Sequence, residues 1–383
     1  EGLESHRLQG AIAGEDQQIC PRKFSTVLLF DGPEQATRLA KQIDASGPIS
    51  VSEYMRAANE EYYNKADPFG ADGDFITAPE ISQMFGELIG LWFADIWMRQ
   101  NRPENVKYVE LGPGRGTLAS DALRAMRRFD LNLPAHFVET SNALKAMQQK
   151  AVPEATIHER IAQLPEDGPL FILANEFFDA LPVRQFVATH AGWRERVVAR
   201  DHGNKFIAIA GSQAVDELVP MDLRGAPAQS IFESSPQSSD AIYELSARLS
   251  NQGGALLIVD YGYAHPGLGS TLQAVKTHEY AEPFENPGNL DLSAHVNFLE
   301  ISNLAKLRDL RVSGPTEQGQ WLRALGLNQR AEALAKTSPD RADEIVIARN
   351  RLASPEEMGS LFKVLSITSP DWPSPEGFAQ TAI

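Results

Sequence analysis

Val106-Lys-Tyr-Val-Glu-Leu-Gly-Pro-Gly-Arg-Gly-Thr-Leu-Ala-Ser-Asp121 runs from a strand pattern through a glycine turn into a helix pattern. The first six residues are mostly β-branched, aromatic or aliphatic, and after Gly116 the apolar side chains recur at helical spacing. Because glycine has no Cβ, a ligand can approach the main chain at such a turn, where the N–H groups of the helix N-terminus are free. The stretch therefore predicts an α/β unit with a ligand at its turn.

The spacing of the glycines narrows the kind of ligand. A dinucleotide-binding turn places its third small residue three positions after the second glycine. Here Gly116 comes two positions after Gly114, and position 117 is Thr. With Glu110 before Gly112, the pattern resembles the first motif of class I methyltransferases that use S-adenosylmethionine. A plain strand-to-helix turn is the structural alternative, and a nicotinamide-dependent oxidoreductase is disfavoured by this spacing.

An acid ends the second predicted strand, Ala135-His-Phe-Val-Glu139. In an α/β fold such a carboxylate can accept hydrogen bonds from both ribose hydroxyls, because it offers several acceptor sites in one plane. Glu139 is therefore a candidate for binding the ribose of a nucleoside. The alternative is a solvated side chain at the end of a strand.

Further acids follow two apolar runs that read as central parallel strands, 170–174 and 255–259. Asn175, Glu176 and Asp179 follow the first run and Asp260 follows the second. Ligands of open α/β sheets bind beyond the carboxyl ends of the strands, and carboxylates there suit a cation such as a guanidinium. Glu176, Asp179 and Asp260 are therefore the candidate catalytic residues. A loop that caps a helix with Asp179 is the alternative.

The rest of the sequence predicts helices, antiparallel strands and a long loop added to this core. Helices are expected at 34–45, 49–58 and 78 to about 99, the last with a capping box formed by Thr77 and Glu80. Its polar residues Ser82, Gln83 and Glu87 are compatible with a surface position. Residues 183–211 read as an antiparallel excursion, 212–240 as an extended surface segment and 263–290 as a long loop that acts as a lid or binding segment.

The bulk composition excludes several classes of protein. The net charge of −16 argues against a nucleic-acid-binding surface. No apolar run approaches the roughly 20 residues of a membrane span. Cys20 is the single cysteine, so the chain can form neither an internal disulfide nor a Cys-based zinc site, and a reducing compartment is favoured. The eight His residues show no metal-ligand spacing, and we expect no metal.

Six stretches together resemble the MidA family of S-adenosylmethionine-dependent methyltransferases. They are Gly73-Asp-Phe-Ile-Thr-Ala-Pro-Glu-Ile-Ser-Gln-Met-Phe-Gly-Glu87, Val109-Glu-Leu-Gly-Pro-Gly-Arg-Gly-Thr117, Ala174-Asn-Glu-Phe-Phe-Asp-Ala-Leu-Pro182, Val259-Asp-Tyr-Gly262, Asp291-Leu-Ser-Ala-His-Val-Asn-Phe298 and Met358-Gly-Ser-Leu-Phe-Lys-Val-Leu365. The resemblance spans about residues 34–367. Mitochondrial members of that family dimethylate an arginine of a respiratory complex I subunit during assembly.

The resemblance implies an architecture and a set of site residues. The expected fold is α/β, with a Rossmann-like class I methyltransferase sheet, helices on both faces and an inserted antiparallel β portion at about 183–240. We expect a tail at 1–33, a helical cover of the cofactor at 34–104 and the methyltransferase core at 105–383. The implied acceptor-facing acids are Glu176 and Asp179, and the expected cofactor-binding residues are Glu110, Gly112, Gly114, Gly116, Thr117, Glu139, Thr77, Ser82, Gln83 and Asn175.

The sequence departs from the family at a few positions. Asn297 stands where relatives commonly carry Asp, which puts an acid role there in doubt, and Glu61 stands where relatives often have Gly. Residues 1–32 match nothing in the family.

The function implied is methylation of an arginine in a protein substrate, a complex I subunit or its bacterial counterpart, with S-adenosylmethionine as cofactor. A cofactor-binding assembly factor that grips an unassembled subunit is the alternative. A homodimer is one option for the oligomeric state. The start shows no Arg- and Ser-rich amphipathic pattern, which favours the cytoplasm over the mitochondrial matrix.

Overall fold

The computed structural model describes residues 34–65, 77–265, 267–276 and 279–378. Contacts divide the chain into two units, Glu1–Asp31 and Gly32–Ile383, and all described residues belong to the second. The expected N-terminal tail with Cys20, and residues 66–76 before Thr77, lie outside the described residues. Within the described part of the chain, no helix has both the length and the apolar character needed to cross a bilayer.

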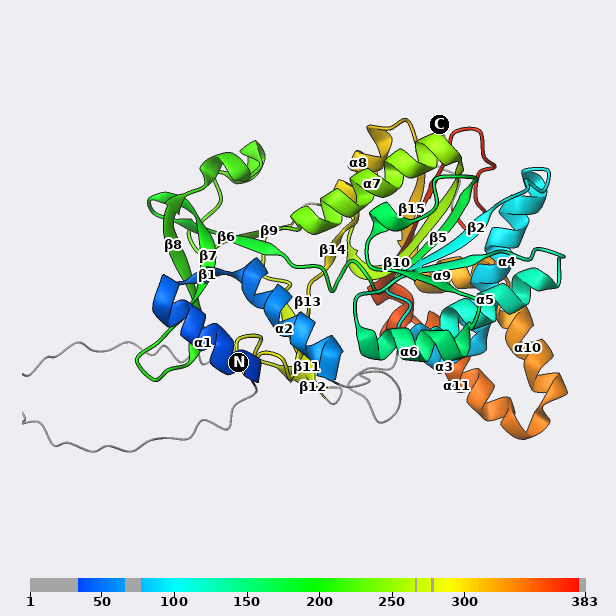
Figure 1. The fold of residues 1–383 in the computed structure, drawn as a ribbon, viewed down its shortest axis with the longest axis horizontal. Helices are drawn as coiled ribbons and strands as arrows, with labels where there is room; N and C mark the ends of the chain where they lie inside the picture. Colours follow the sequence, from blue (N-terminus) through cyan, green and yellow to red (C-terminus); the bar gives the residue numbers. More distant parts are fainter. Residues whose placement is uncertain (1–33, 66–76, 266, 277–278, 379–383) are drawn as a thin grey trace, which may run out of the picture. The chain divides into compact units, whose positions relative to one another are not determined.

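A mixed sheet forms the core, as expected from the apolar strand patterns (Figure 1). In the described chain it has eight strands: β2 (Lys107–Leu111), β3 (Ala135–Val138), β4 (Thr156–His158), β5 (Leu170–Asn175), β10 (Gly254–Tyr263), β14 (Val296–Asn297), β15 (Arg311–Glu317) and β16 (Phe362–Thr368). The order is β15-β16-β10-β5-β2-β3-β4, with β14 beside the end of β10. Strands β10, β5, β2, β3 and β4 are parallel, so their carboxyl ends share one edge. The expected Rossmann-like α/β fold is confirmed.

Helices cover both faces of this sheet. Apolar side chains pack one face against α4 (Gln83–Arg99), α5 (Thr117–Arg127), α9 (Gln318–Ala324), α10 (Leu327–Thr337) and α11 (Ala342–Ala353). The other face packs against α7 (Pro236–Gln252) and α8 (Phe298–Lys306), which lie side by side. The helix α6 (Asn142–Ala151) connects β3 to β4, and a short 3₁₀ turn (Ile161–Gln163) follows β4. The alternation of buried residues along each strand thus divides the core into two layers.

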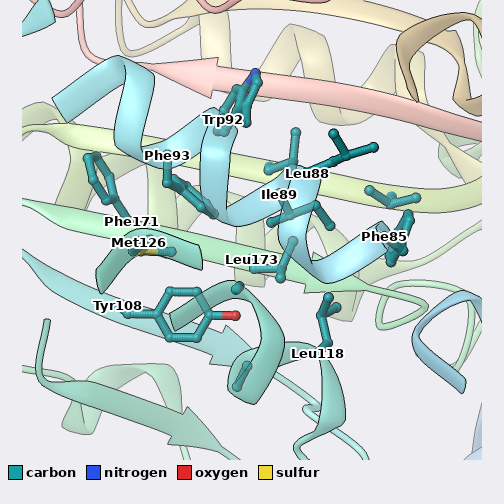
Figure 2. Close-up of a cluster of buried hydrophobic side chains, with 14 of the residues drawn as sticks. Phe85, Leu88, Ile89, Trp92, Phe93, Tyr108, Leu118, Met126, Phe171 and Leu173 are labelled. Atoms are coloured by element: carbon teal, nitrogen blue, oxygen red, sulfur yellow. The ribbon is translucent and has the colours of Figure 1, made fainter. Parts of the chain in front are cut away.

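Helix α4 packs unusually close to α5, and two glycines one turn apart permit this. A Cβ on Gly90 would lie 2.4 Å from the carbonyl oxygen of Ala122, and one on Gly86 would lie 2.6 Å from Cβ of Asp121. Phe85, Leu88, Ile89, Trp92 and Phe93 of α4 converge on the sheet beside this contact (Figure 2). Residues 83–99, part of the expected cofactor cover, therefore form a layer of the central α/β core.

The expectation of one helix from residue 78 to about 99 is wrong. The chain forms a short α3 (Ala78–Ile81), becomes extended at Ser82 (φ −164°, ψ 138°) and then starts α4. The Ser82 hydroxyl accepts the N–H of Met84 and caps the new helix, a role that serine favours strongly. The expected capping box is absent, because the Thr77 side chain makes no capping hydrogen bond.

Glu87 is buried rather than on the surface. Its carboxylate pairs with the Arg330 guanidinium of α10 through two hydrogen bonds, at 2.6 and 2.9 Å. Arg124 of α5 lies 3.7 Å away. The sequence contains no local sign of this pair, because its partner is far along the chain. The ion pair ties α10 to α4 and α5.

A second sheet is built around the insertion. Its five described strands are β1 (Ile49–Ser50), β6 (Arg184–Thr189), β7 (Gly192–Arg200), β8 (Phe206–Ala214) and β9 (Ile231–Ser234). The helices α1 (Glu34–Ser46) and α2 (Val51–Lys65) pack on it through Leu39, Tyr54 and Met55. The expected extended segment 212–240 instead contains two 3₁₀ turns (Asp216–Leu218 and Met221–Leu223), strand β9 and the start of α7.

The predicted lid loop 263–290 is also more ordered than expected. It contributes β11 (Gln273–Lys276) and β12 (Glu279–Ala281), which form a three-stranded antiparallel sheet with β13 (Asp291–Ser293). Short strands give only a weak alternating pattern in the sequence. The many Gly and Pro residues in this segment indicated a loop instead of strands. The helices α10 and α11, a 3₁₀ turn (Pro339–Arg341) and the π-helical segment η5 (Pro355–Gly359) were not predicted.

Candidate functional site

A cleft of about 1310 Å³ opens at the carboxyl ends of β2, β3, β5 and β10. Residues of α2, β11, β12 and β13 line it as well, so the additions to the core form part of its wall. This is the edge at which open α/β sheets bind their ligands.

The glycine turn contributes bare backbone to this cleft. Gly112 and Gly114 line it, and both have positive φ, at 59° and 54°. A Cβ on Gly112 would come within 3.1 Å of the Phe177 ring, so a side chain there would crowd the cleft. Gly116, with φ 83°, starts α5 and lies against Ala151 instead. The turn therefore offers two of its three glycines directly to a ligand.

Glu139 lies in the cleft just after β3, and its carboxylate is held from both sides. One oxygen accepts the backbone N–H groups of Thr140 at 2.8 Å and Ser141 at 2.7 Å. The other accepts the side-chain amide of Gln148 at 3.0 Å, and that amide also bonds the carbonyl of Gly114. Burial raises the pKa of Glu139, and these hydrogen bonds oppose the shift.

These residues fit a nucleoside cofactor. The remaining acceptor positions of Glu139 are fixed in direction and suit vicinal hydroxyls. Gln148 has a buried side-chain oxygen with no partner among the described residues, beside the same turn. The apolar side chains of Leu144 and Ile161 line the adjoining part of the cleft and suit an adenine ring. The cleft can thus hold the two ends of such a cofactor, at Glu139 and at the glycine turn.

Glu110 is placed differently from the other candidates. It is buried and does not line the cleft. Its carboxylate accepts the Tyr108 hydroxyl at 2.5 Å, on the sheet face that packs against α4 and α5. Burial raises the pKa of Glu110 to about 8, although this hydrogen bond lowers it. The Glu110 side chain therefore lies in the core, bonded to Tyr108, and does not face the cleft.

Of the α3–α4 candidates, the structure brings only Thr77 to the cleft. Ser82 caps α4, and the Gln83 amide lies 3.4 Å from a carboxylate oxygen of Glu87. The Thr117 hydroxyl donates to the Glu80 carboxylate at 2.8 Å, which joins α3 to α5. These contacts lie within and between α3, α4 and α5, and Ser82, Gln83 and Thr117 do not line the cleft.

Two acids after β5, Glu176 and Asp179, also line the cleft. Glu176 has a positive φ of 49°, a conformation that costs a non-glycine residue about 1 kcal/mol and tends to be retained at functional sites. Burial, with the charge of Asp179 in addition, raises the pKa of Glu176 to about 8. The Asn175 side chain, itself outside the lining, donates to Glu176 at 3.3 Å.

Asp179 lines the cleft and has one unsatisfied carboxylate oxygen. One carboxylate oxygen accepts the Tyr261 hydroxyl at 2.5 Å, and the other has no partner among the described residues. Burial raises the pKa of Asp179 to about 6, and the Tyr261 hydrogen bond opposes the shift. A buried carboxylate with an unused acceptor is costly unless a donor arrives, so this position suits a cationic or hydrogen-bond-donating ligand.

The third acid, Asp260, lies under the site and not in it. Its side chain is fully buried and absent from the lining of the cleft. Its oxygens accept the N–H groups of Phe178 at 3.0 Å, Asp179 at 3.3 Å and Tyr261 at 2.9 Å. Asp260 therefore shapes the turn that carries Glu176 and Asp179, and it has no exposed oxygen for catalysis.

Several lining residues were not predicted from the sequence as site residues. Tyr63 of α2 donates to Asp291 of β13 at 2.9 Å, and the Asn59 amide bonds both the N–H and the carbonyl of Leu292. Tyr261 packs edge-on against His295. The family motifs that contain Tyr261, Asp291 and His295 were the available signal. No three His, Cys, Asp or Glu side chains in the described chain form a group that could hold a metal ion.

Comparisons with known proteins agree with this geometry. Residues 88–316 match the family model described as "Putative S-adenosyl-L-methionine-dependent methyltransferase". The chain is 34% identical to the protein arginine methyltransferase NDUFAF7 homolog, mitochondrial, of Drosophila melanogaster, over 87% of this chain and 84% of that protein. It is also 34% identical to the protein arginine methyltransferase NDUFAF7, mitochondrial, of Danio rerio, over 86% of this chain and 85% of that protein.

A solved structure agrees as well. A Burkholderia thailandensis protein, crystallised with S-adenosyl-homocysteine bound, superposes with a TM-score of 0.81. It is 26% identical to this chain, and the match covers 90% of this chain and 94% of that one. The chain belongs to the family of S-adenosyl-L-methionine-dependent methyltransferases that the matching model describes, and its cofactor is S-adenosylmethionine.

Proposed function

We propose that this methyltransferase modifies an arginine side chain of a protein. The observation that carries the proposal is the pair of carboxylates, Glu176 and Asp179, that line the cofactor cleft, with one oxygen of Asp179 lacking a partner in the part of the chain that the structure describes. Two carboxylates with fixed directions match the fork of donors on a guanidinium. The relatives named as protein arginine methyltransferases support the same acceptor.

Each site residue then has a role. Glu139, Gly112 and Gly114 bind the cofactor, with Thr77 at the edge of the cleft. When bound, S-adenosylmethionine supplies an electrophilic methyl group. Glu176 binds and orients the guanidinium, so that its nitrogen is aligned for an in-line displacement; such positioning supplies much of the rate in reactions of this kind. Asp179 accepts the proton that the guanidinium loses, and Tyr261 holds Asp179 in place.

The finer setting follows from the family resemblance. A respiratory complex I subunit, or its bacterial counterpart, is the acceptor that the resemblance implies. The named relatives are mitochondrial, which favours the mitochondrial matrix over the cytoplasm that the sequence suggested. The alternative function, an assembly factor that acts by binding an unassembled subunit, needs no carboxylate pair in the cofactor cleft.

Replacing Glu139 by Gln will weaken binding of S-adenosylhomocysteine by about 10- to 100-fold, as expected for hydrogen bonds to a charged group. A glutamine has a single acceptor oxygen, and its NH₂ group would face either the Gln148 amide or the sugar. Isothermal titration calorimetry measures the change. Glu154→Gln, at an exposed position after α6, is the matched control and will bind normally. Equal affinity of the two variants would remove Glu139 from the cofactor site.

Replacing Glu176 by Gln, or Asp179 by Asn, will lower methyl transfer to an arginine peptide by about 30-fold or more, since each removes a charge-assisted hydrogen bond. Cofactor affinity will change less than about 2-fold, because neither side chain serves the ribose. Transfer of labelled methyl groups and calorimetry measure the two effects. Full transfer by Glu176→Gln contradicts the proposal. Rescue of an assembly defect by both inactive variants favours the assembly-factor alternative.

The pH dependence follows from the raised pKa values. Both acids are protonated below their raised pKa, and a neutral carboxyl binds a guanidinium weakly. The kcat/KM for the acceptor will therefore rise with pH from about 6 and level off near 8. Tyr261→Phe removes a hydrogen bond that lowers the pKa of Asp179, so it will shift the acidic limb to higher pH. A kcat/KM that stays constant between about pH 6 and 8, or that has the same pH dependence in Tyr261→Phe, contradicts the proposed roles of Glu176 and Asp179.

A further inference from the structure

The cleft carries far more negative charge than one guanidinium needs. Its lining, among the described residues, includes ten Asp and Glu side chains but only three Arg side chains. Three of the acids, Glu139, Glu176 and Asp179, already have proposed roles. Seven acids remain, and several of them are exposed at the rim of the cleft rather than buried in it.

The rim acids come from both faces of the central sheet. On α7, Gln237, Asp240, Ala241 and Glu244 line the cleft at steps of three and four, so one side of this helix faces it. The segment η5, which follows α11 on the opposite face of the sheet, adds Glu356 and Glu357. The cleft therefore runs past the edge of the sheet, from α7 on one face to η5 on the other, and acidic side chains line it on both sides.

The acids differ in whether the protein itself neutralises them. Glu244 lies 3.7 Å from Arg248 in an ion pair. In the described part of the chain, Asp240, Glu356 and Glu357 form no ion pair, and all three are exposed. Unpaired rim charges of one sign attract a ligand of the opposite sign and set its orientation.

Exposed apolar side chains lie along the same cleft. Tyr280 of β12 is 82% exposed and Leu361, before β16, is 52% exposed, and both line it. Large apolar side chains left open beside a charged cleft are typical of surfaces that bind a polypeptide. Asp179 lines the same cleft, is more than nine-tenths buried and has one carboxylate oxygen without a partner among the described residues, so this position suits a hydrogen-bond-donating acceptor side chain.

We propose that the acceptor is a basic segment of a protein, in which further Lys or Arg residues flank the methylated arginine. Asp240 on α7 and the Glu356–Glu357 pair on η5 bind the flanking cations. Tyr280 and Leu361 contact the chain between them. This inference rests on the proposed arginine methylation and adds the class of sequence around the target.

Binding of three short fluorescent peptides to the full chain, in the presence of S-adenosylhomocysteine, tests the inference. Each has a central arginine, flanked by Lys, by Gln or by Glu, and anisotropy gives the Kd. We expect the Lys-flanked peptide to bind about 5-fold tighter than the Gln-flanked one at low salt, since two exposed ion pairs contribute about that factor. The Glu-flanked peptide will bind most weakly. The difference will shrink at about 500 mM salt, where exposed charges are screened.

A matched pair of variants assigns the effect to the rim. The double variant Asp240→Asn with Glu356→Gln removes one acid from each side of the cleft and will lose the preference for Lys. The control, Glu332→Gln with Asp343→Asn, removes two exposed acids of α10 and α11 that do not line the cleft, and it will keep the preference. Equal affinity for the Lys- and Gln-flanked peptides, or equal loss in both variants, overturns the inference.

Methyl transfer to the same peptides separates this inference from the proposed function. Transfer to the Gln- and Lys-flanked peptides with equal Kd and equal rate contradicts the basic-segment inference and leaves arginine methylation intact. Preferential binding of the Lys-flanked peptide without transfer to any peptide supports the basic-segment inference and contradicts the proposed function.

Discussion

The buried carboxylate of Asp260 is the constraint on which the site depends. It lies at the end of β10, and its oxygens accept N–H groups from the neighbouring turn after β5 and from Tyr261. Burial raises the pKa of Asp260 well above its ordinary value. The three N–H groups satisfy this acid and bend the chain so that Glu176 and Asp179 face the cleft. Asp260, which the sequence suggested as a catalytic acid, thus supports the turn that carries Glu176 and Asp179.

The cleft has two chemical halves that follow from the order of the strands. The ends of β2 and β3 provide the glycine backbone and the fixed carboxylate of Glu139, which suit a nucleoside. The end of β5 provides two carboxylates with raised pKa values, which suit a cation. Tyr63 of α2 and Asp291 of β13 close the wall above them through a hydrogen bond. Elements far apart in sequence therefore complete a site whose two reactive ends come from adjacent parallel strands.

Local sequence patterns predicted the strands and turns that depend mainly on residues close together in the chain. Apolar runs predicted β5 and β10, and the glycine spacing predicted the turn before α5. The family resemblance supplied the sheet type and the cofactor. Of the predicted site residues at strand ends and at the glycine turn, Gly112, Gly114, Glu139, Glu176 and Asp179 line the cleft, whereas Gly116, Asn175 and Asp260 do not.

Most of the wrong predictions concern residues whose structure depends on a partner far away in the sequence. Glu87 is buried because Arg330 reaches it, and Asp260 is enclosed because the turn after β5 folds over it. The strands β11 and β12 form only because β13 completes their sheet. Ser82 is a local exception, because its hydroxyl accepts the N–H of Met84 and starts a new helix inside an otherwise continuous helical pattern. None of these pairings leaves a periodic signal in the residues nearby.

A crystal structure with S-adenosylhomocysteine and an arginine peptide will show whether one cleft holds both reactants. We expect the ribose hydroxyls on Glu139, the main chain of Gly112 and Gly114 against the cofactor, and the guanidinium between Glu176 and Asp179. A guanidinium bound away from these two acids, or a ribose that does not contact Glu139, would contradict this expectation.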